Sequence, residues 1–258
     1  MSRNAALDPL IVNRIAERCK GAAGVLFVTG AGISTESGLP TYRGVGGLYN
    51  QGATEEGLPI EEILSGRMIT RDPSVCWKYL RRMEKVCRNA QPSYAHKIVA
   101  AFERRVPRTW VLTQNVDNLH ARAGSTNVIA VHGSLGRLSC MACSYRAEVE
   151  SYSRLEEVPR CPRCGAAVRP DAVLFGERLP DTAVAAMDRE LTQGFDVIFS
   201  IGTTSVFPYI RAPLLLGRQR GAMTVEINPE DTAASHLVDH RLRTRAGEAL
   251  SAIWEKMS

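Results

Sequence analysis

The chain has 258 residues, of which 45% are hydrophobic, so it can bury a sizeable core as one large domain or as one domain with a small inserted module. The net charge of +5 is mildly basic and does not by itself indicate a nucleic-acid partner. No run approaches the roughly 20 apolar residues of a membrane span, and Met1–Asp8 lack the apolar core of a signal peptide, so we expect a cytoplasmic protein.

The first half of the chain alternates predicted helices with apolar strands. Asp8 followed by Pro9 is typical of a helix start, and the apolar run Val25–Thr29 predicts a strand buried on both faces. Residues 36–70 contain too many glycines and prolines for a long element, and a loop of that length is usually functional. Further elements are then expected in this order: helices at 72–88 and 93–104, and strands at 110–113 and 128–131.

The second half begins with a cysteine-rich stretch. Residues 139–169 contain no long apolar run, so we interpret them as a separate small module. Strands are then expected at 172–176, 196–202 and 223–228, and helices at 181–193 and 246–257. This alternation of strands and helices predicts the α/β class, with a Rossmann-like, doubly wound parallel sheet.

A glycine turn, Gly30-Ala31-Gly32, follows the first predicted strand. Glycines at such a turn let the backbone approach a pyrophosphate, with N–H groups directed at it. The third glycine of the usual dehydrogenase fingerprint would fall at Thr35, and the acidic residue expected about twenty residues later would fall near Gly52. The glycines alone therefore leave two interpretations open, a dinucleotide site of another type or a structural turn.

Four of the seven cysteines form two Cys-x-x-Cys pairs, Cys140 with Cys143 and Cys161 with Cys164. The separation between the pairs matches a zinc ribbon, and four protein ligands leave no open position on the metal. We therefore predict one structural zinc. Redox-active dithiols are the weaker alternative, because two such pairs at this spacing rarely serve redox chemistry.

Polar residues follow two of the predicted strands. His132 comes directly after Val128–Val131, at the sheet edge where such folds bind ligands, and a histidine there can act as a general base. Asn115 and Asp117 follow the strand at 110–113 and could bond a carboxamide. The alternatives are a structural histidine and an Asx turn that satisfies the local backbone.

The last fifth of the chain is rich in arginine. We favour a solvated face over a surface for acidic partners. The residues concerned are Arg211, Arg218, Arg220, Arg241, Arg243 and Arg245.

Taken together, these residues resemble the sirtuins, the NAD-dependent protein deacylases. The longest matching strings are Gly30–Arg43, Thr113–His120 and Val131–Gly133. The cysteine pairs follow, and then Phe175-Gly176-Glu177, Ile201-Gly202-Thr203 and Glu226-Ile227-Asn228. The resemblance runs from about residue 20 to the end of the chain, in the order of the family.

The resemblance implies a Rossmann-like domain made of residues 1–40, 93–138 and 170–258. Residues 41–92 would form a cofactor-binding loop and a helical insertion, and residues 139–169 the zinc ribbon. NAD and an acylated lysine of a protein substrate would meet between the two parts. The products would be nicotinamide, O-acetyl-ADP-ribose and the deacetylated protein.

The resemblance also implies roles for individual residues. His132 would be the base, assisted by Asn115. The cofactor would contact Gly30, Ala31, Gly32, Tyr42, Arg43, Gln114, Asn115, Val116, Asp117, Gly202, Thr203, Thr204, Ser205, Asn228 and Ala246. The substrate peptide would pair with Leu174, Phe175 and Gly176, and the zinc would be bound by Cys140, Cys143, Cys161 and Cys164.

Two features depart from the family pattern. The loop after Thr203 is one residue shorter than usual. Relatives that prefer acidic acyl groups carry a tyrosine and an arginine three apart, and Tyr79 and Arg82 have this spacing, but alignment from Trp77 places Leu80 and Met83 there instead. We therefore favour acetyl-lysine over succinyl-lysine as the substrate.

Other functions are weighed as alternatives. They are desuccinylation, mono-ADP-ribosylation of protein and, more distantly, a non-catalytic zinc-ribbon module that binds nucleic acid or another acidic partner. We expect neither a membrane nor a nucleic-acid partner, and the sequence leaves the oligomeric state open.

Overall fold

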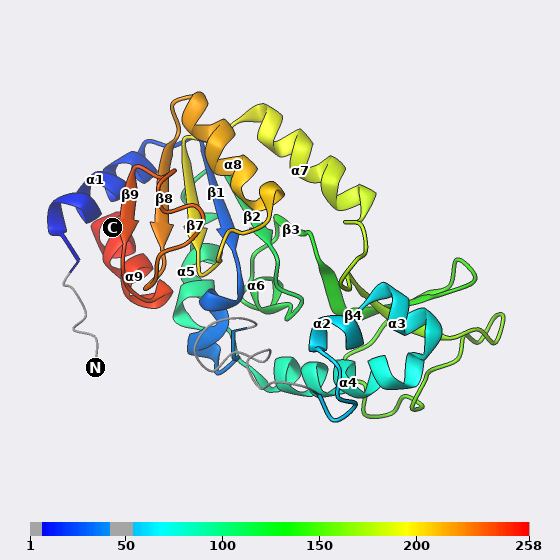
Figure 1. The fold of residues 1–258 in the computed structure, drawn as a ribbon. Helices are drawn as coiled ribbons and strands as arrows, with labels where there is room; N and C mark the ends of the chain where they lie inside the picture. Colours follow the sequence, from blue (N-terminus) through cyan, green and yellow to red (C-terminus); the bar gives the residue numbers. More distant parts are fainter. Residues whose placement is uncertain (1–6, 42–53, 258) are drawn as a thin grey trace.

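Six parallel strands form the sheet that organises the larger part of the molecule in a computed structural model, which describes residues 7–41 and 54–257 (Figure 1). They are β1 (Gly24–Thr29), β2 (Arg108–Thr113), β3 (Val128–Ala130), β7 (Val197–Ile201), β8 (Met223–Ile227) and β9 (His240–Leu242). Their spatial order is β3-β2-β1-β7-β8-β9, so the strand order reverses between β1 and β7. This is the doubly wound arrangement expected from the sequence.

Both faces of this sheet are covered by helices, because its strands are apolar on both sides. In β1, Val25 and Phe27 pack toward one face, and Leu26 and Val28 pack toward the other. The first face carries α1 (Pro9–Lys20), α5 (Tyr94–Phe102) and α9 (Ala246–Met257), and the second carries α7 (Asp181–Gln193) and α8 (Pro208–Gln219). Within the described ranges, no helix has both the length and the apolar character that a membrane span needs.

A smaller part lies beside the carboxyl ends of the parallel strands (Figure 1). It contains α2 (Ile60–Ile63), α3 (Gly66–Arg71), α4 (Pro73–Asn89) and an antiparallel sheet of β4 (Gly133–Cys140), β5 (Arg146–Glu148) and β6 (Val168–Ala172). Trp77 of α4 is fully buried at its centre, where its indole N–H donates to the Val168 carbonyl at 3.0 Å. That bond fixes the helices of this part to its sheet.

The helix starts follow their sequence signals. The Asp8 carboxylate accepts from the Leu10 amide at 2.8 Å at the start of α1, and Asp72 accepts from the Ser74 amide at 3.2 Å at the start of α4. After β1, the described chain forms only short elements before α4, namely a 3-10 helix at Ala31–Ser37, α2 and α3. Tyr42 and Arg43, both predicted cofactor contacts, lie outside the described residues.

Several elements differ from the sequence-based expectation. The strand predicted at 172–176 is wrong beyond Ala172, where β6 ends, and Phe175 makes only a single bridge to Ser65. The chain turns there because the Glu177 side chain accepts from the Leu174 amide at 2.8 Å, and Gly176 has a φ of 81°. Helix α8, strand β9 and the short α6 (Leu119–Arg122) were not predicted; α8 contains Pro213, which resembles a helix breaker in a sequence.

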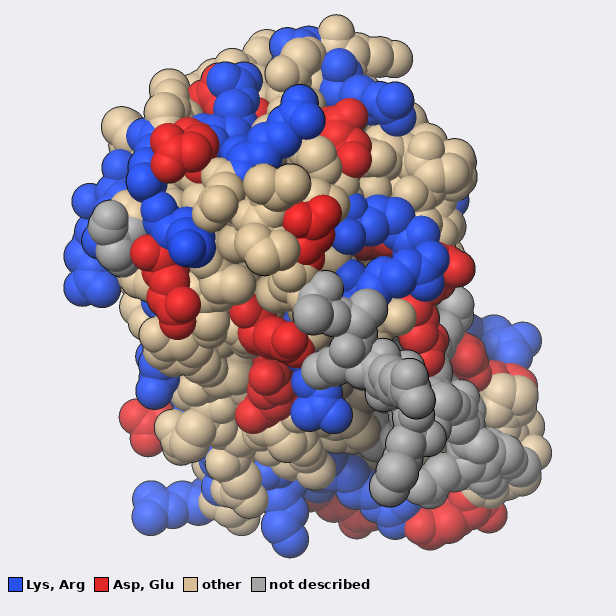
Figure 2. Space-filling model, turned by 90° about the vertical axis from the view of Figure 1, so that its left-hand side faces the viewer, with Lys and Arg blue, Asp and Glu red and all other residues tan. Residues whose placement is uncertain are grey.

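Some arginines of the last fifth of the chain, among them Arg241 and Arg243, lie among acidic partners. Arg241 bonds Glu226 at 3.0 Å and also contacts Asp231, which accepts from Arg243 at 2.7 Å. Figure 2 shows basic and acidic side chains intermixed on the side of the molecule where α1, β9 and α9 lie. This mixing favours the solvated face expected from the sequence.

The turn after β1 lies directly against the turn after β7. The Gly32 amide donates to the Gly202 carbonyl at 2.8 Å, and a Cβ added at Gly32 would come within 2.5 Å of the Gly202 Cα. Gly202 itself has a φ of 58°, which disfavours a side chain there as well. Backbone packing alone therefore requires glycine at position 32, whatever ligand the turn binds.

We expect Gly32→Ala to lower the free energy of unfolding by about 1–3 kcal/mol, because the new methyl group meets backbone that cannot yield. Urea denaturation followed by circular dichroism measures this difference. Gly21→Ala is the matched control, since a Cβ there would approach nothing closer than 3.9 Å and its φ is −89°. Equal stability of the two variants would contradict the packing argument.

Candidate functional site

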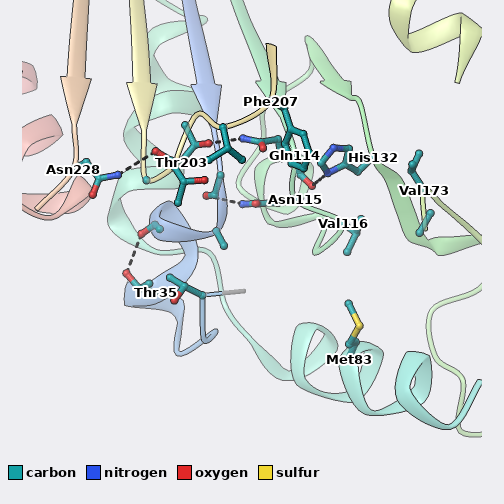
Figure 3. Close-up of a pocket in the computed structure, with 18 of the residues that line it drawn as sticks. Thr35, Met83, Gln114, Asn115, Val116, His132, Val173, Thr203, Phe207 and Asn228 are labelled. Carbon is teal, nitrogen blue, oxygen red and sulfur yellow. Dashed lines mark hydrogen bonds between the residues drawn. The ribbon is translucent and has the colours of Figure 1, made fainter. Parts of the chain in front are cut away.

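A cavity of about 830 Å³ lies between the carboxyl ends of the parallel strands and the smaller part (Figure 3). Its lining comes from the turns after β1, β2, β3, β7 and β8, and from α4 and the segment after β6. The strand order reverses between β1 and β7, and this is the position at which doubly wound sheets bind ligands.

Most residues predicted for the site line this one cavity. They are Gly30, Ala31, Gly32, Gln114, Asn115, Val116, His132, Leu174, Phe175, Gly176, Gly202, Thr203, Thr204, Asn228 and Ala246. Asp117 and Ser205 are not among the described lining residues.

The imidazole of His132 is fixed by the backbone beside it. Its Nδ1 lies 2.9 Å from the Gln114 carbonyl oxygen (Figure 3), and a carbonyl can only accept, so Nδ1 carries the proton in the neutral ring. Nε2 is then the bare, basic nitrogen. Burial lowers the pKa of His132 below its ordinary value of 6.5, and the bond to Gln114 acts in the opposite direction. The neutral imidazole is therefore the dominant form at pH 7.

His132 owes its position to the residue that follows it. Gly133 has a φ of 73°, and a Cβ there would lie 1.9 Å from the Asp171 carbonyl oxygen. The chain therefore leaves β3 and enters β4 of the smaller sheet within one sharp turn. His132 sits at that turn, and its carbonyl accepts from the Val173 amide at 2.9 Å.

Asn115 presents an unpaired acceptor. Its amide nitrogen donates to the Gly30 carbonyl at 3.1 Å and to the Ser34 hydroxyl at 3.2 Å, whereas its Oδ1 is buried without a hydrogen-bond partner. A buried amide oxygen without a partner costs about 1–3 kcal/mol. A ligand that donates an N–H or O–H to this atom would remove that cost.

Polar bonds connect the turns along the cavity. Gln114 donates to the Thr203 hydroxyl at 2.8 Å, and Asn228 donates to the Thr203 carbonyl at 3.2 Å (Figure 3). These bonds join the ends of β2, β7 and β8. The cavity floor is thus held together before any ligand binds.

Asp117 and Ser205 are turned away from the cavity. Asp117 accepts from the Leu119 amide at 2.9 Å and from the Ser34 hydroxyl at 2.8 Å, and burial raises the pKa of its carboxyl. The first of these bonds is the Asx turn that the sequence left as an alternative. Ser205 is fully buried, with its hydroxyl 3.4 Å from that of Ser200.

The wall contributed by the smaller part is apolar. Leu80 and Met83 of α4 line it, and Figure 3 shows Met83 directed toward Val116. Leu64, Leu135 and Val173 complete this wall.

Tyr79 and Arg82 do not line the cavity. The Tyr79 hydroxyl donates to Glu56, and Arg82 pairs with Glu55 at 2.6 Å. Arg82 therefore lies on another side of α4 from Leu80, and the bond to Glu56 holds the Tyr79 hydroxyl outside the cavity.

Several lining residues were missed by the sequence analysis, among them Glu36, Val173, Phe207 and Tyr209. Tyr209 belongs to the first turn of α8, and its hydroxyl lies 2.8 Å from Nε2 of His132. The available signal was Pro208, which suits the first position of a helix and so indicates that a helix starts there, directly after the turn that follows β7.

The four paired cysteines are placed to bind a metal ion. Their sulfur atoms all lie within 4.8 Å of one another, and the Cys140–Cys164 and Cys143–Cys161 sulfurs are 3.5 and 3.6 Å apart. Four thiolates around zinc, each at about 2.3 Å, would be separated by about 3.8 Å. Amides of Ala142 and Arg163 donate to two of these sulfurs at 3.3 and 3.4 Å. This donor set fits a closed, structural zinc.

Comparisons with known proteins agree with this geometry. The model of the Sir2 family matches residues 30–208. An NAD-dependent protein deacylase 2 of Pseudomonas aeruginosa is 46% identical over 235 residues, covering 90% of this chain and 91% of that protein.

Two solved structures have the same fold. A Sir2 homologue in complex with NAD superposes with a TM-score of 0.84 at 36% identity, covering 100% of this chain and 98% of the other. A Sir2 protein with a p53 peptide and NAD+ gives a TM-score of 0.81 at 26% identity, with 94% and 97% covered.

We expect Cys161→Ser to lower the zinc content well below the roughly one ion per chain of the parent protein, because a serine hydroxyl is a far weaker ligand than a thiolate. Cys161 is buried in the core of the smaller part, so residues 133–172 should become sensitive to limited proteolysis while the parallel sheet remains folded. Atomic absorption and mass spectrometry of the fragments provide the two readouts.

Cys87→Ser is the matched control, since Cys87 is not one of the four clustered cysteines. It should retain the metal and the proteolytic resistance. A Cys161→Ser protein with a full zinc equivalent would rule out the tetrathiolate site.

Proposed function

The chain belongs to the Sir2 family, and from that premise we propose that it is an NAD-dependent protein-lysine deacetylase. The observation that carries this proposal is the position of His132. Its Nδ1 is held by the Gln114 carbonyl, and its ring lines the same cavity as the glycine turn, Asn115 and an apolar wall. A base, a dinucleotide-binding edge and an apolar channel are the three parts that deacylation at the expense of NAD requires.

The cavity offers separate positions for the parts of NAD. The turns at Gly30–Gly32 and Gly202–Thr204 lie at the switch point of the sheet, where backbone groups can approach phosphates. The unpaired Oδ1 of Asn115 can accept from the nicotinamide carboxamide or from the adjoining ribose. Asn228 and Ala246, at the ends of β8 and beyond β9, would lie on the adenosine side.

The residues of this chain bind and orient the reactants, exclude water and move one proton. NAD, when bound, supplies an electrophilic ribose carbon through the departure of nicotinamide. Val116 and its apolar neighbours exclude water from that carbon. His132 then removes a proton from a ribose hydroxyl at Nε2, because Nδ1 is already committed to the Gln114 carbonyl. The bond to Gln114 stabilises the imidazolium that forms.

The substrate peptide would enter beside the segment after β6. Leu174, Phe175 and Gly176 line the cavity, and the residues near them have left the sheet. An extended peptide could lie along this segment, and its acylated lysine could then reach His132. The p53 peptide in a related Sir2 structure supports this class of partner.

The apolar wall favours an acetyl group over a succinyl group. Leu80 and Met83 occupy the side of α4 that faces the cavity, whereas Arg82 is paired with Glu55 outside it. Among the described lining residues the only cation is Arg245, which follows β9 at the opposite end of the cavity. A carboxylate buried against the wall would lack a partner.

We also propose that the protein works in the cytoplasm. Two metal-type cysteine pairs and three further thiols suit a compartment that keeps cysteines reduced.

We expect kcat/KM for an acetyl-lysine peptide to exceed that for the matching succinyl-lysine peptide by about 100-fold or more, since the succinyl carboxylate must be desolvated without a counter-charge. Met83→Arg should narrow this ratio by placing a cation on the wall. Peptide mass spectrometry with NAD measures both rates, and formation of O-acetyl-ADP-ribose identifies the reaction.

Arg82→Met is the matched control, because Arg82 lies on the other face of α4. It should leave the acetyl-to-succinyl ratio unchanged. Faster turnover of the succinyl peptide by the parent protein would overturn the acetyl preference, and transfer of ADP-ribose to protein without deacylation would overturn the proposed function.

A buried, neutral His132 also predicts the pH dependence. The base works only when unprotonated, and burial lowers its pKa, so kcat/KM should be constant above about pH 6.5 and fall tenfold per pH unit below the lowered pKa. His132→Ala should lose about 10²–10⁴-fold in deacylation and should retain binding of ADP-ribose. A fall in kcat/KM on the acidic side with its midpoint above pH 7, or full activity of His132→Ala, would contradict the role of His132 as the base.

A further inference from the structure

The basic nitrogen of His132 has a hydrogen-bond partner within the protein. The Tyr209 hydroxyl lies 2.8 Å from Nε2. Because Nδ1 carries the ring proton, Nε2 has a lone pair and no hydrogen, so the phenol must be the donor. Tyr209 therefore occupies the atom to which a ribose hydroxyl would give its proton.

The Tyr209 ring is held in this position by an aromatic stack. Phe207 packs parallel to it, with ring centroids 5.4 Å apart and an interplanar angle of 13°. The same Phe207 meets the His132 ring edge-on at 6.3 Å and 87°. Figure 3 shows Phe207 close to His132 and Gln114. Burial raises the pKa of Tyr209 to about 12, so the phenol remains a neutral donor through the working pH range.

Tyr209 stands in the segment that departs from the family pattern. The loop after Thr203 is one residue short, and it leads through Ser205, with a φ of 53°, to Phe207 and the first turn of α8. The first turn of α8 thus directs Tyr209 into the cavity that it lines.

We propose that Tyr209 caps the base: its hydroxyl saturates Nε2 of His132 in the empty enzyme and must yield that nitrogen to the ribose hydroxyl before catalysis. An imidazole nitrogen has one lone pair, so the two donors exclude each other. This inference rests on the proposed function, because it needs a ribose at His132. The Gln114 carbonyl continues to orient the ring once the phenol has left.

The cap should lower kcat/KM for NAD and weaken the binding of ADP-ribose, because both need the same nitrogen of His132. A net hydrogen bond of this kind changes an equilibrium by about 2- to 10-fold. Tyr209→Phe keeps the stacked ring and removes only the competing hydroxyl, so kcat/KM for NAD should rise by about that factor at saturating acetyl peptide. The dissociation constant of ADP-ribose, measured by calorimetry without peptide, should fall by a similar factor.

Tyr94→Phe is the matched control, because Tyr94 is 61% exposed and begins α5, away from the cavity. It should change neither quantity. Thermal unfolding of both variants and the parent checks that the fold is kept.

The outcomes separate the two proposals. A kcat/KM of Tyr209→Phe that falls, or that matches the parent, overturns the cap, since a hydroxyl that aids the reaction or merely supports the fold cannot slow it. ADP-ribose binding that is equal in the two proteins also overturns the cap, with the deacetylase proposal intact. A parent protein that binds no ADP-ribose overturns the proposed function and the cap together.

Discussion

The close approach of Gly32 to Gly202 is the constraint on which the site depends. The strand order reverses between β1 and β7, so the chain turns away from the sheet in opposite directions after these neighbouring strands. Such a reversal leaves a crevice, and the 2.8 Å bond from the Gly32 amide to the Gly202 carbonyl fixes its floor. Any side chain at either position would push the two turns apart. The glycine turn therefore has a structural role whether or not it also binds a ligand, and the two interpretations left open by the sequence do not exclude each other.

A second constraint places the base. The sharp turn at Gly133 carries the chain from the parallel sheet directly into the smaller antiparallel sheet. His132 thus belongs to the junction, bonded on one side to Gln114 and on the other to Val173. A shift of one part against the other would move the imidazole relative to both walls of the cavity. The geometry of the base is accordingly coupled to the packing of the whole smaller part.

The sequence predicted what local chemistry dictates. The Asp8 and Asp72 helix starts, the buried strands and the cysteine pairs are encoded within a few neighbouring residues, and each was found. Alignment with the family pattern from Trp77 also singled out Leu80 and Met83, and both line the cavity from α4. What escaped prediction depends on contacts distant in the chain. The strand expected at 172–176 ends early because the Glu177 side chain bonds the Leu174 amide. Helix α8 was not predicted because Pro213 resembles a helix breaker. The helix forms nevertheless, since Ile210 and Leu214 are buried against the sheet.

The four-cysteine cluster is coupled to the cavity through the core of the smaller part. Cys161 is only 3% exposed, and it packs in one apolar cluster with Trp77, Leu135 and Leu174. Leu135 and Leu174 line the cavity, so the clustered cysteines and the apolar wall share a single core. A small part of this size cannot bury enough apolar surface to hold its own sheet against conformational entropy, which is why a metal cross-link is useful there. The four-cysteine cluster therefore supports the apolar wall on the His132 side of the cavity, although none of the four cysteines is among the described lining residues.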